Sequence, residues 1–167
     1  SPTWLSRWSS YHLKSKCTAK RFRAGYRLAN AARAPGLGEF RPVCLSLFKK
    51  LESLQPDLVV SAGFMRILAS DTVSHFRIVN SHPALLPLFP GAHAVRDALA
   101  AGATQSGTTI HWVDSGVDTG EIIAQEAIEI APTDTEDSLH ERIKILERSL
   151  IVATIEQLLS TMENGRS

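Results

Sequence analysis

Residues Pro56–Phe64 read PDLVVSAGF, a continuous apolar run bounded by a proline and a glycine. A short run of this kind is typical of a parallel strand that is covered on both faces. The strand itself is expected over Asp57–Ala62. An amphipathic helix is predicted before it, over Val43–Leu54, and a short helix after it, over Asp71–Phe76.

The rest of the chain continues this alternation of helices and strands. Thr133 and Glu136 fit a capping box at the start of a long final helix. The other predicted elements are strands over Arg77–Asn80, Gly107–Asp114 and Glu121–Ile130, a helix over Ala94–Ala101, and the final helix to about Leu159. We therefore predict an α/β fold with three layers and a mostly parallel sheet, whose functional loops follow the carboxyl ends of its strands.

The composition places the chain among globular proteins. It has 167 residues, 44% apolar residues, 21% charged residues and a formal net charge of +1, which excludes collagen-like, wholly disordered and disulfide-stapled classes. No apolar run approaches the roughly 18 residues that cross a bilayer, so no membrane association is expected. The first 16 residues lack an apolar signal core, and the two cysteines predict reduced thiols. We therefore expect a cytoplasmic protein.

The positive charge is concentrated at the N-terminus. Residues 1–40 carry eight Lys and Arg and one acid, which gives +7, and the remaining residues carry ten bases and sixteen acids, which gives −6. This step predicts a basic arm over 1–40 and a catalytic domain over 41–167. The arm either contacts nucleic acid or an acidic surface, or is a poorly ordered or foreign N-terminus. The missing aromatic platform favours the second interpretation, so no nucleic-acid partner is expected.

The loop after the Arg77–Asn80 strand reads SHPALLPLFPGAH, and its three prolines exclude regular structure. Asn80 and His82 stand two residues apart at the strand end, so their side chains leave it on the same side. The amide donates without titrating, and the imidazole both donates and moves a proton, which suits a developing oxyanion. The alternative is a histidine with only a structural or surface role.

The segment DSGVDTGEII places Asp114 and Asp118 in a glycine-flanked turn between two predicted strands. A carboxylate beside His82 would fix the tautomer of the imidazole and stabilise its protonated form. The alternative is an ordinary hairpin turn. His111 belongs to an alternating strand pattern, so we expect it to face the surface of the sheet. No metal site is expected, because no His, Cys and Asp cluster has ligand spacing.

Several motifs together resemble a known family. The segments AGFMRIL, NSHPALLPLFPGAHAVRDAL, GTTIHWVDSGVDTGEIIAQ and LHERIKILERSL resemble the phosphoribosylglycinamide formyltransferases of purine synthesis over about residues 47–160. The resemblance implies a formyltransferase-like, Rossmann-like fold. It also implies direct transfer of a formyl group from 10-formyltetrahydrofolate, as co-substrate, to the amine of glycinamide ribonucleotide.

The resemblance also implies roles for particular residues. Asn80, His82 and Asp118 match the catalytic constellation, in which the first two stabilise the oxyanion and Asp118 holds His82. The implied folate-contact residues are Met65, Arg66, Ile67, Leu68, Asn80, Asp114, Ser115, Gly116, Val117 and Asp118. The implied ribonucleotide-binding residues are Pro83 and Glu147.

The chain departs from the family pattern at its start. The family opens with a strand and a Gly-Ser-Asn loop that holds the substrate phosphate through backbone N–H groups. No such loop is found here, and residues 1–40 are expected to match nothing in the family. Glu121 stands where the family usually has proline, and Arg148 stands where it has histidine.

Other functions stay open beside the formyltransferase. A formyltetrahydrofolate deformylase and a methionyl-tRNA formyltransferase share the Asn, His and Asp, but each carries an additional domain that a chain of this length has no room for. A non-catalytic, folate-binding remnant is the third interpretation. In each case we expect small-molecule ligands and a monomer or homodimer.

Overall fold

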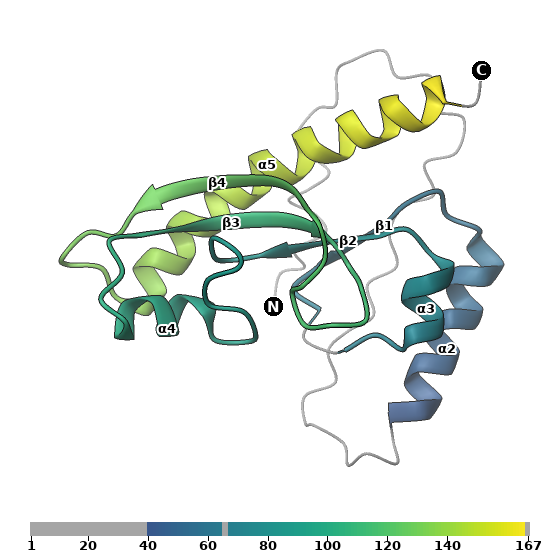
Figure 1. Cartoon of the computed structure of the whole chain (residues 1–167), viewed down its shortest axis with the longest axis horizontal. Coiled ribbons are helices and arrows are strands. Elements are labelled where there is room, and N and C mark those ends of the chain that lie inside the picture. The colour runs from purple at the N-terminus through teal and green to yellow at the C-terminus, as the bar shows by residue number, and fades with distance from the viewer. Residues whose placement is uncertain (1–39, 65–66, 166–167) are drawn as a thin grey trace, which may run out of the picture. The chain divides into compact units, whose positions relative to one another are not determined.

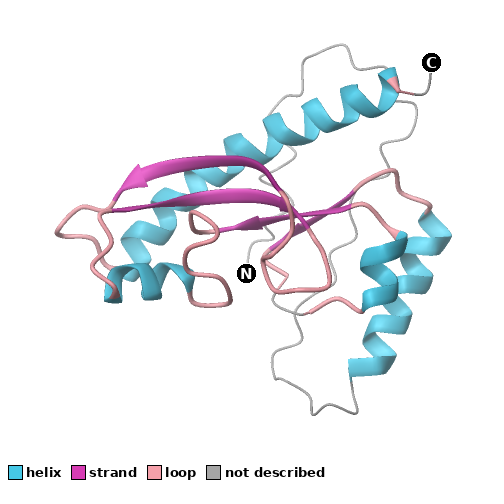
Figure 2. Ribbon diagram, viewed as in Figure 1, coloured by secondary structure: helices cyan, strands magenta, loops and turns pink. Residues whose placement is uncertain are grey.

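The computed structural model describes residues 40–64 and 67–165 of the chain. Helices and strands alternate along this part except for the last two strands, which follow each other directly, as Figure 1 and Figure 2 show, and every element predicted within it is present. In chain order the elements are α2 (Phe40–Leu54), β1 (Val59–Ala62), α3 (Ser70–His75), β2 (Ile78–His82), α4 (Ala94–Ala100), β3 (Gln105–Trp112), β4 (Ile122–Glu129) and α5 (Glu136–Asn164). Apart from Phe40, the predicted basic arm lies outside the described residues.

The four described strands form one mixed sheet in the order β1-β2-β3-β4 (Figure 1). β1 and β2 are parallel, whereas β2 with β3 and β3 with β4 are antiparallel. The prediction of a mostly parallel sheet is therefore wrong for the described strands. The loop 113–121 that joins β3 to β4 contains no helix, and neighbouring strands joined so briefly pair antiparallel, because a parallel pair needs a longer crossover.

β1 is less covered than its apolar sequence suggests. Its residues alternate between half-buried and exposed, and Val60 is 40% exposed. Among the described strands β1 pairs with β2 alone, and α5 packs mainly on β3 and β4. The prediction of a strand covered on both faces is therefore wrong for β1. The described residues show one helical layer against the sheet, not the two that a three-layer arrangement needs.

Two apolar clusters hold α5 against the sheet and against α4. The first joins β2, β3 and α5 and consists of Val79, Ile110 and Ile151. The second joins α4 and α5 and consists of Val95, Leu139 and Ile143. Burying one such side chain contributes roughly 1.5–3 kcal/mol, so these clusters fix β2 and β3 firmly relative to each other.

The start of α5 differs from its predicted form. The cap is Thr135, whose hydroxyl accepts from the backbone N–H of Ser138 at 3.2 Å, while the Ser138 hydroxyl accepts from the N–H of Thr135 at 2.9 Å. The predicted capping box of Thr133 and Glu136 is therefore wrong. Ser138 takes the part that glutamate plays in the usual box, since its hydroxyl also reaches back to the cap.

Candidate active site

β2 carries Asn80 and His82 to its carboxyl end, where the long loop to α4 begins. The strand runs between β1 and β3, and His82 is only 4% exposed. Alternation along the strand sends both side chains to the same face, as expected from their spacing. A buried strand end thus holds an amide and an imidazole in fixed positions.

Both ring nitrogens of His82 face oxygen atoms. Nδ1 lies 3.3 Å from Oδ2 of Asp118, and Nε2 lies 2.9 Å from the carbonyl oxygen of Phe89. A carbonyl and a carboxylate can only accept hydrogen bonds, so only the doubly protonated ring donates to both at once. The geometry therefore places Asp118 as the carboxylate partner of the ring, on the side of Nδ1.

The two residues that contact the His82 ring have unusual backbone conformations. Phe89 has φ +52° and Asp118 has φ +54°, and both lie in the left-handed region that residues other than glycine rarely adopt. Such a conformation costs on the order of 1–3 kcal/mol and persists only where the surroundings impose it. The backbone N–H of Gly91 donates to Asp118 Oδ2 at 2.8 Å and so ties the two loops together.

His111 is a member of this cluster that the sequence analysis missed. It is 2% exposed, and its Nε2 lies 3.3 Å from Nδ2 of Asn80 and 3.5 Å from Oδ1 of Asp118. The expectation that it faces the sheet surface is wrong. β2 and β3 pair antiparallel with Asn80 directly opposite His111, and directly opposite residues point to the same face. The alternating pattern around His111 shows that its side chain lies on one face of a strand. Only the register with β2 shows that this is the face that carries Asn80.

Asp114 and Asp118 have different roles in their turn. Asp114 accepts from the N–H of Gly116 at 3.0 Å and from the Thr119 hydroxyl at 2.8 and 3.0 Å. Its carboxylate is therefore engaged in holding the turn itself, as aspartates commonly are. Asp118 instead faces inward to His82, so the structure separates the supporting acid from the one in the cluster.

A pocket of about 270 Å³ opens beside Asp118. It is lined by the β2–α4 loop on one side and the β3–β4 turn on the other, through Leu86, Pro87, Pro90, Val117, Asp118, Thr119, Gly120 and Ile122. Apolar walls around one charged group are the usual composition of a small-molecule site.

The remaining predicted site residues are spread more widely. Met65 and Arg66 lie outside the described residues. Ile67 is 65% exposed, and neither it nor Leu68 lines the pocket beside Asp118. Pro83 follows His82 directly and is half-buried, and Glu147 is half-buried on α5. The contacts that build the His82 cluster do not include Glu147.

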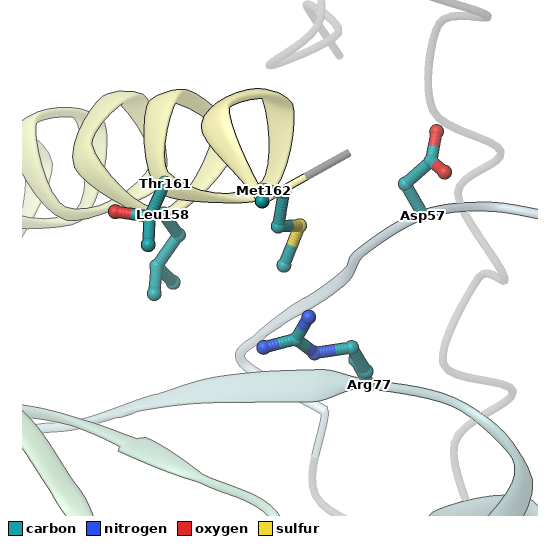
Figure 3. Close-up of a pocket in the computed structure, with 6 residues that line it drawn as sticks. Asp57, Arg77, Leu158, Thr161 and Met162 are labelled. Carbon is teal, nitrogen blue, oxygen red and sulfur yellow. The ribbon is translucent and has the colours of Figure 1, made fainter. Parts of the chain in front are cut away.

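A second pocket, of about 350 Å³, lies at the opposite end of β2 (Figure 3). Figure 3 shows the Arg77 side chain extending toward Met162 of α5. Arg77 immediately precedes β2, whereas His82 ends it, and the Arg77 guanidinium carbon lies 5.2 Å from the centre of a Trp112 ring. None of the predicted site residues lines this pocket, so its larger volume does not make it the active site.

The described part of the chain contains neither a cluster that could hold a metal ion nor a helix that could span a membrane. There, no group of three or more His, Cys, Asp and Glu side chains is placed to hold a metal ion. No helix in that part of the chain has the length and apolar character needed to span a membrane.

A sequence profile of the family described as formyl transferase matches residues 19–155. This chain belongs to the formyl transferase family. The match begins well before residue 47, so the expectation that residues 1–40 match nothing in the family is wrong from residue 19 onward. The formyl transferase match includes Asn80, His82, His111 and Asp118.

Individual formyl transferases are similar over much of the chain. A phosphoribosylglycinamide formyltransferase of Mycobacterium tuberculosis is 56% identical over 106 residues, which cover 62% of this chain and 49% of that protein. One of Bacillus subtilis is 40% identical over 122 residues, which cover 72% of this chain and 63% of that protein. The chain thus spans about half the length of the Mycobacterium tuberculosis relative.

A solved structure of a formyl transferase has a similar fold. The crystal structure of phosphoribosylglycinamide formyltransferase from Streptococcus pneumoniae superposes with a TM-score of 0.68 at 46% identity, and the match covers 71% of this chain and 67% of that one. The α/β fold, with the mixed sheet of the four described strands, therefore matches the fold of that formyltransferase.

Proposed function

We propose that this formyl transferase family member transfers a formyl group from 10-formyltetrahydrofolate to the primary amine of glycinamide ribonucleotide, in purine synthesis. The observation that carries the proposal is the buried His82 ring, 3.3 Å from the Asp118 carboxylate beside an apolar pocket that Asp118 lines. Relatives with 56% and 40% identity bear the name phosphoribosylglycinamide formyltransferase, which supports the same substrates here.

We assign the folate co-substrate, which would supply the formyl carbon, to the pocket beside Asp118. Leu86, Pro87, Val117 and Ile122 offer apolar walls to a ring system, and Asp118 is the charged group among them. The folate contacts implied by the resemblance remain proposals, namely Met65–Leu68, Asn80 and Asp114–Asp118. Pro83 and Glu147 remain proposed contacts of the ribonucleotide.

In the transfer, the amine nitrogen forms a bond to the formyl carbon, the bond from that carbon to the folate nitrogen breaks, and a proton passes from the amine to that nitrogen. Asn80 and His82 donate hydrogen bonds to the formyl oxygen as it gains negative charge. His82 carries the proton, and Asp118 stabilises the charged ring. Because His82 Nε2 bonds to Phe89, the ring must release that carbonyl to reach the substrate through Nε2.

A second candidate is a protein that binds folate without transferring the formyl group. The observation that favours it is the mostly apolar pocket beside Asp118, in a sequence without a Gly-Ser-Asn stretch for the substrate phosphate. A third is another folate-dependent formyl enzyme, a deformylase, which hydrolyses the formyl group to formate.

An assay on the purified chain separates the three candidates. We expect formyl transfer to glycinamide ribonucleotide, and a loss of about 10²–10³ in rate for His82→Ala with nearly unchanged affinity for a folate analogue. His140→Ala, on α5 and outside the cluster, is the control. Folate binding without transfer supports the second candidate, and formate release without ribonucleotide supports the third. Near-normal turnover of His82→Ala contradicts the assignment of His82.

Further proposals concern the whole protein. We propose a catalytic domain over 41–167 with a formyltransferase-like fold, which follows a basic arm over 1–40. The protein acts on small molecules in the cytoplasm, as a monomer or homodimer. Size-exclusion chromatography with light scattering measures the oligomeric state directly.

A further inference from the structure

Leu86, in the loop between β2 and α4, is held at both of its backbone groups by side chains of the β3–β4 hairpin. Its N–H donates to the Thr109 hydroxyl at 3.1 Å, and its carbonyl accepts from Nε2 of Gln125 at 3.0 Å. Thr109 and Gln125 are directly opposite each other on β3 and β4. One cross-strand pair thus holds one residue of the loop at both its N–H and its carbonyl.

The clamp uses every hydrogen-bonding position of the Thr109 hydroxyl and both N–H groups of the Gln125 amide. The Thr109 hydroxyl donates to the carbonyl of Ala84 at 2.6 Å and accepts from Leu86 and, at 2.8 Å, from Gln125. One donor and two acceptor positions are the full capacity of a hydroxyl. The Gln125 amide uses its two N–H groups on Thr109 and Leu86, so the network requires nitrogen, and not oxygen, at this position.

The clamped residue lies just before the loop atoms that touch the catalytic cluster. Phe89, three residues after Leu86, offers its carbonyl to His82 at 2.9 Å, and Gly91 donates to Asp118 at 2.8 Å. Leu86 itself lines the pocket beside Asp118, whereas Gln125 does not. Gln125 therefore reaches the site through its bonds to Leu86 and to Thr109, the residue opposite His82.

We infer that Gln125 is a positioning residue, whose amide sets the path of the β2–α4 loop and so places Phe89 against His82. The inference deepens the proposed function, since it assigns a support for the same site. The part that concerns the His82 ring does not depend on which reaction the protein catalyses.

The test compares Gln125→Glu with Glu126→Gln in the full chain. Gln125→Glu keeps the shape of the side chain but replaces the N–H donor with an oxygen, which faces the Leu86 carbonyl and the Thr109 hydroxyl, both acceptors of the lost N–H groups. Gln125 is exposed, so the strand can carry a charge at this position without unfolding. Glu126 is the exposed neighbour on β4 that points to the other face, so its swap is the matched control. The readouts are ring NMR of His82 and formyl transfer.

In Gln125→Glu we expect the Nε2 proton of His82 to exchange at least about tenfold faster with solvent and kcat to fall roughly ten- to hundredfold. Glu126→Gln should leave both unchanged. Thr109→Ser should keep the clamp, and Thr109→Val should break it. Unchanged exchange of the His82 proton in Gln125→Glu overturns the inference. A parent chain without transfer activity refutes the proposed function instead, and the ring measurement still decides the role of Gln125.

Discussion

Nε2 of His111 lies 3.3 Å from Nδ2 of Asn80, directly across the antiparallel pairing of β2 and β3. His111 Nδ1 faces the carbonyl of Trp112 at 2.9 Å. When Nδ1 carries the proton and donates to that carbonyl, Nε2 is left to accept from the Asn80 amide. The pair thus orients the amide that we propose as an oxyanion donor.

Replacing His111 tests this orientation. In His111→Ala the Asn80 amide loses its acceptor and can rotate, so we expect turnover to fall roughly ten- to hundredfold. Steady-state kinetics with both substrates measures the effect, and His140→Ala serves as the control. If His111→Ala turns over within about twofold of the parent chain, Asn80 does not need His111 for its position.

Asp118→Asn tests the charge in the cluster. The asparagine keeps the size of the side chain but removes the negative charge that lies near both His82 and His111. We expect the rate to fall by about 10²-fold or more, because the imidazolium loses its partner. Asp114→Asn, in the same turn but directed at its own backbone, is a proposed folate contact, so we expect it to raise KM for the folate and to change kcat at saturating folate much less. Equal losses in the two variants would show that the turn, and not the Asp118 charge, determines the rate.

Gly120 allows the end of the β3–β4 turn to pack closely against the backbone of Trp112. A Cβ at this position would lie 1.7 Å from the carbonyl oxygen of Trp112, which is backbone and cannot move aside cheaply. We expect Gly120→Ala to lower the free energy of unfolding by about 1–3 kcal/mol. Gly165→Ala is the control, since its Cβ would meet Thr161 at an ordinary 3.5 Å. Equal midpoints of urea unfolding for the two variants would contradict the predicted clash.

Asp134 makes stability depend on pH at the start of α5. Its carboxylate accepts from the N–H of Ala131 and the Ser138 hydroxyl and pairs with Arg142, and these contacts lower its pKa below 3.8, the first contact being the largest cause. A carboxylate whose pKa is lower in the folded than in the unfolded state stabilises the fold at pH values above its unfolded-state pKa. This stability is lost as the pH falls through the folded-state pKa.

Asp134→Asn should therefore unfold at a lower temperature than the parent chain at neutral pH. The gap should close as the pH falls from about 4 toward the lowered pKa. Asp137→Asn, in the first turn of α5, controls for the loss of a charge near the helix N-terminus. A gap in Tm that is constant from neutral to strongly acidic pH would exclude this origin.

The two proposed ligands should bind unequally. The pocket beside Asp118 offers apolar walls, so a folate analogue should bind at about micromolar strength, or near −8 kcal/mol. Glycinamide ribonucleotide should bind more weakly, because each charge-assisted hydrogen bond missing from its phosphate costs roughly 1.5–3 kcal/mol. Where the basic residues of 1–40 hold the phosphate as point charges, binding should weaken with salt. Calorimetry at low and high salt measures both, and tight, salt-insensitive ribonucleotide binding would reveal a phosphate site not identified in this chain.

Local signals in the sequence were sufficient for the elements and for part of the cluster. Apolar periodicity, prolines and glycines predict each described helix and strand, because these signals act over a few residues. The spacing of Asn80 and His82 predicts that they share a face. The glycine-flanked turn provides the acid, and Asp118 lies beside His82 at 3.3 Å.

Properties that depend on pairing between strands could not be predicted in the same way. The sequence predicted a mostly parallel sheet, in which β2 and β3 have no antiparallel register. The position of His111 directly opposite Asn80 therefore could not be predicted. The exposure of Val60 depends on what covers β1, which the apolar run of that strand does not reveal. The cap at Thr135 was not predicted because the usual capping box has glutamate or glutamine three residues after the cap, and this chain has Ser138 there.

The position of β2 inside the sheet has a consequence for how the active site opens. β2 bonds to a neighbour on each side, so exposing its amides to exchange requires breaking two ladders, an event close to global unfolding. Phe89 and Asp118, the two contacts of the His82 ring, belong to loops. A local opening of either loop releases the ring while the strand stays paired. His82 therefore keeps its place through fluctuations that change its partners.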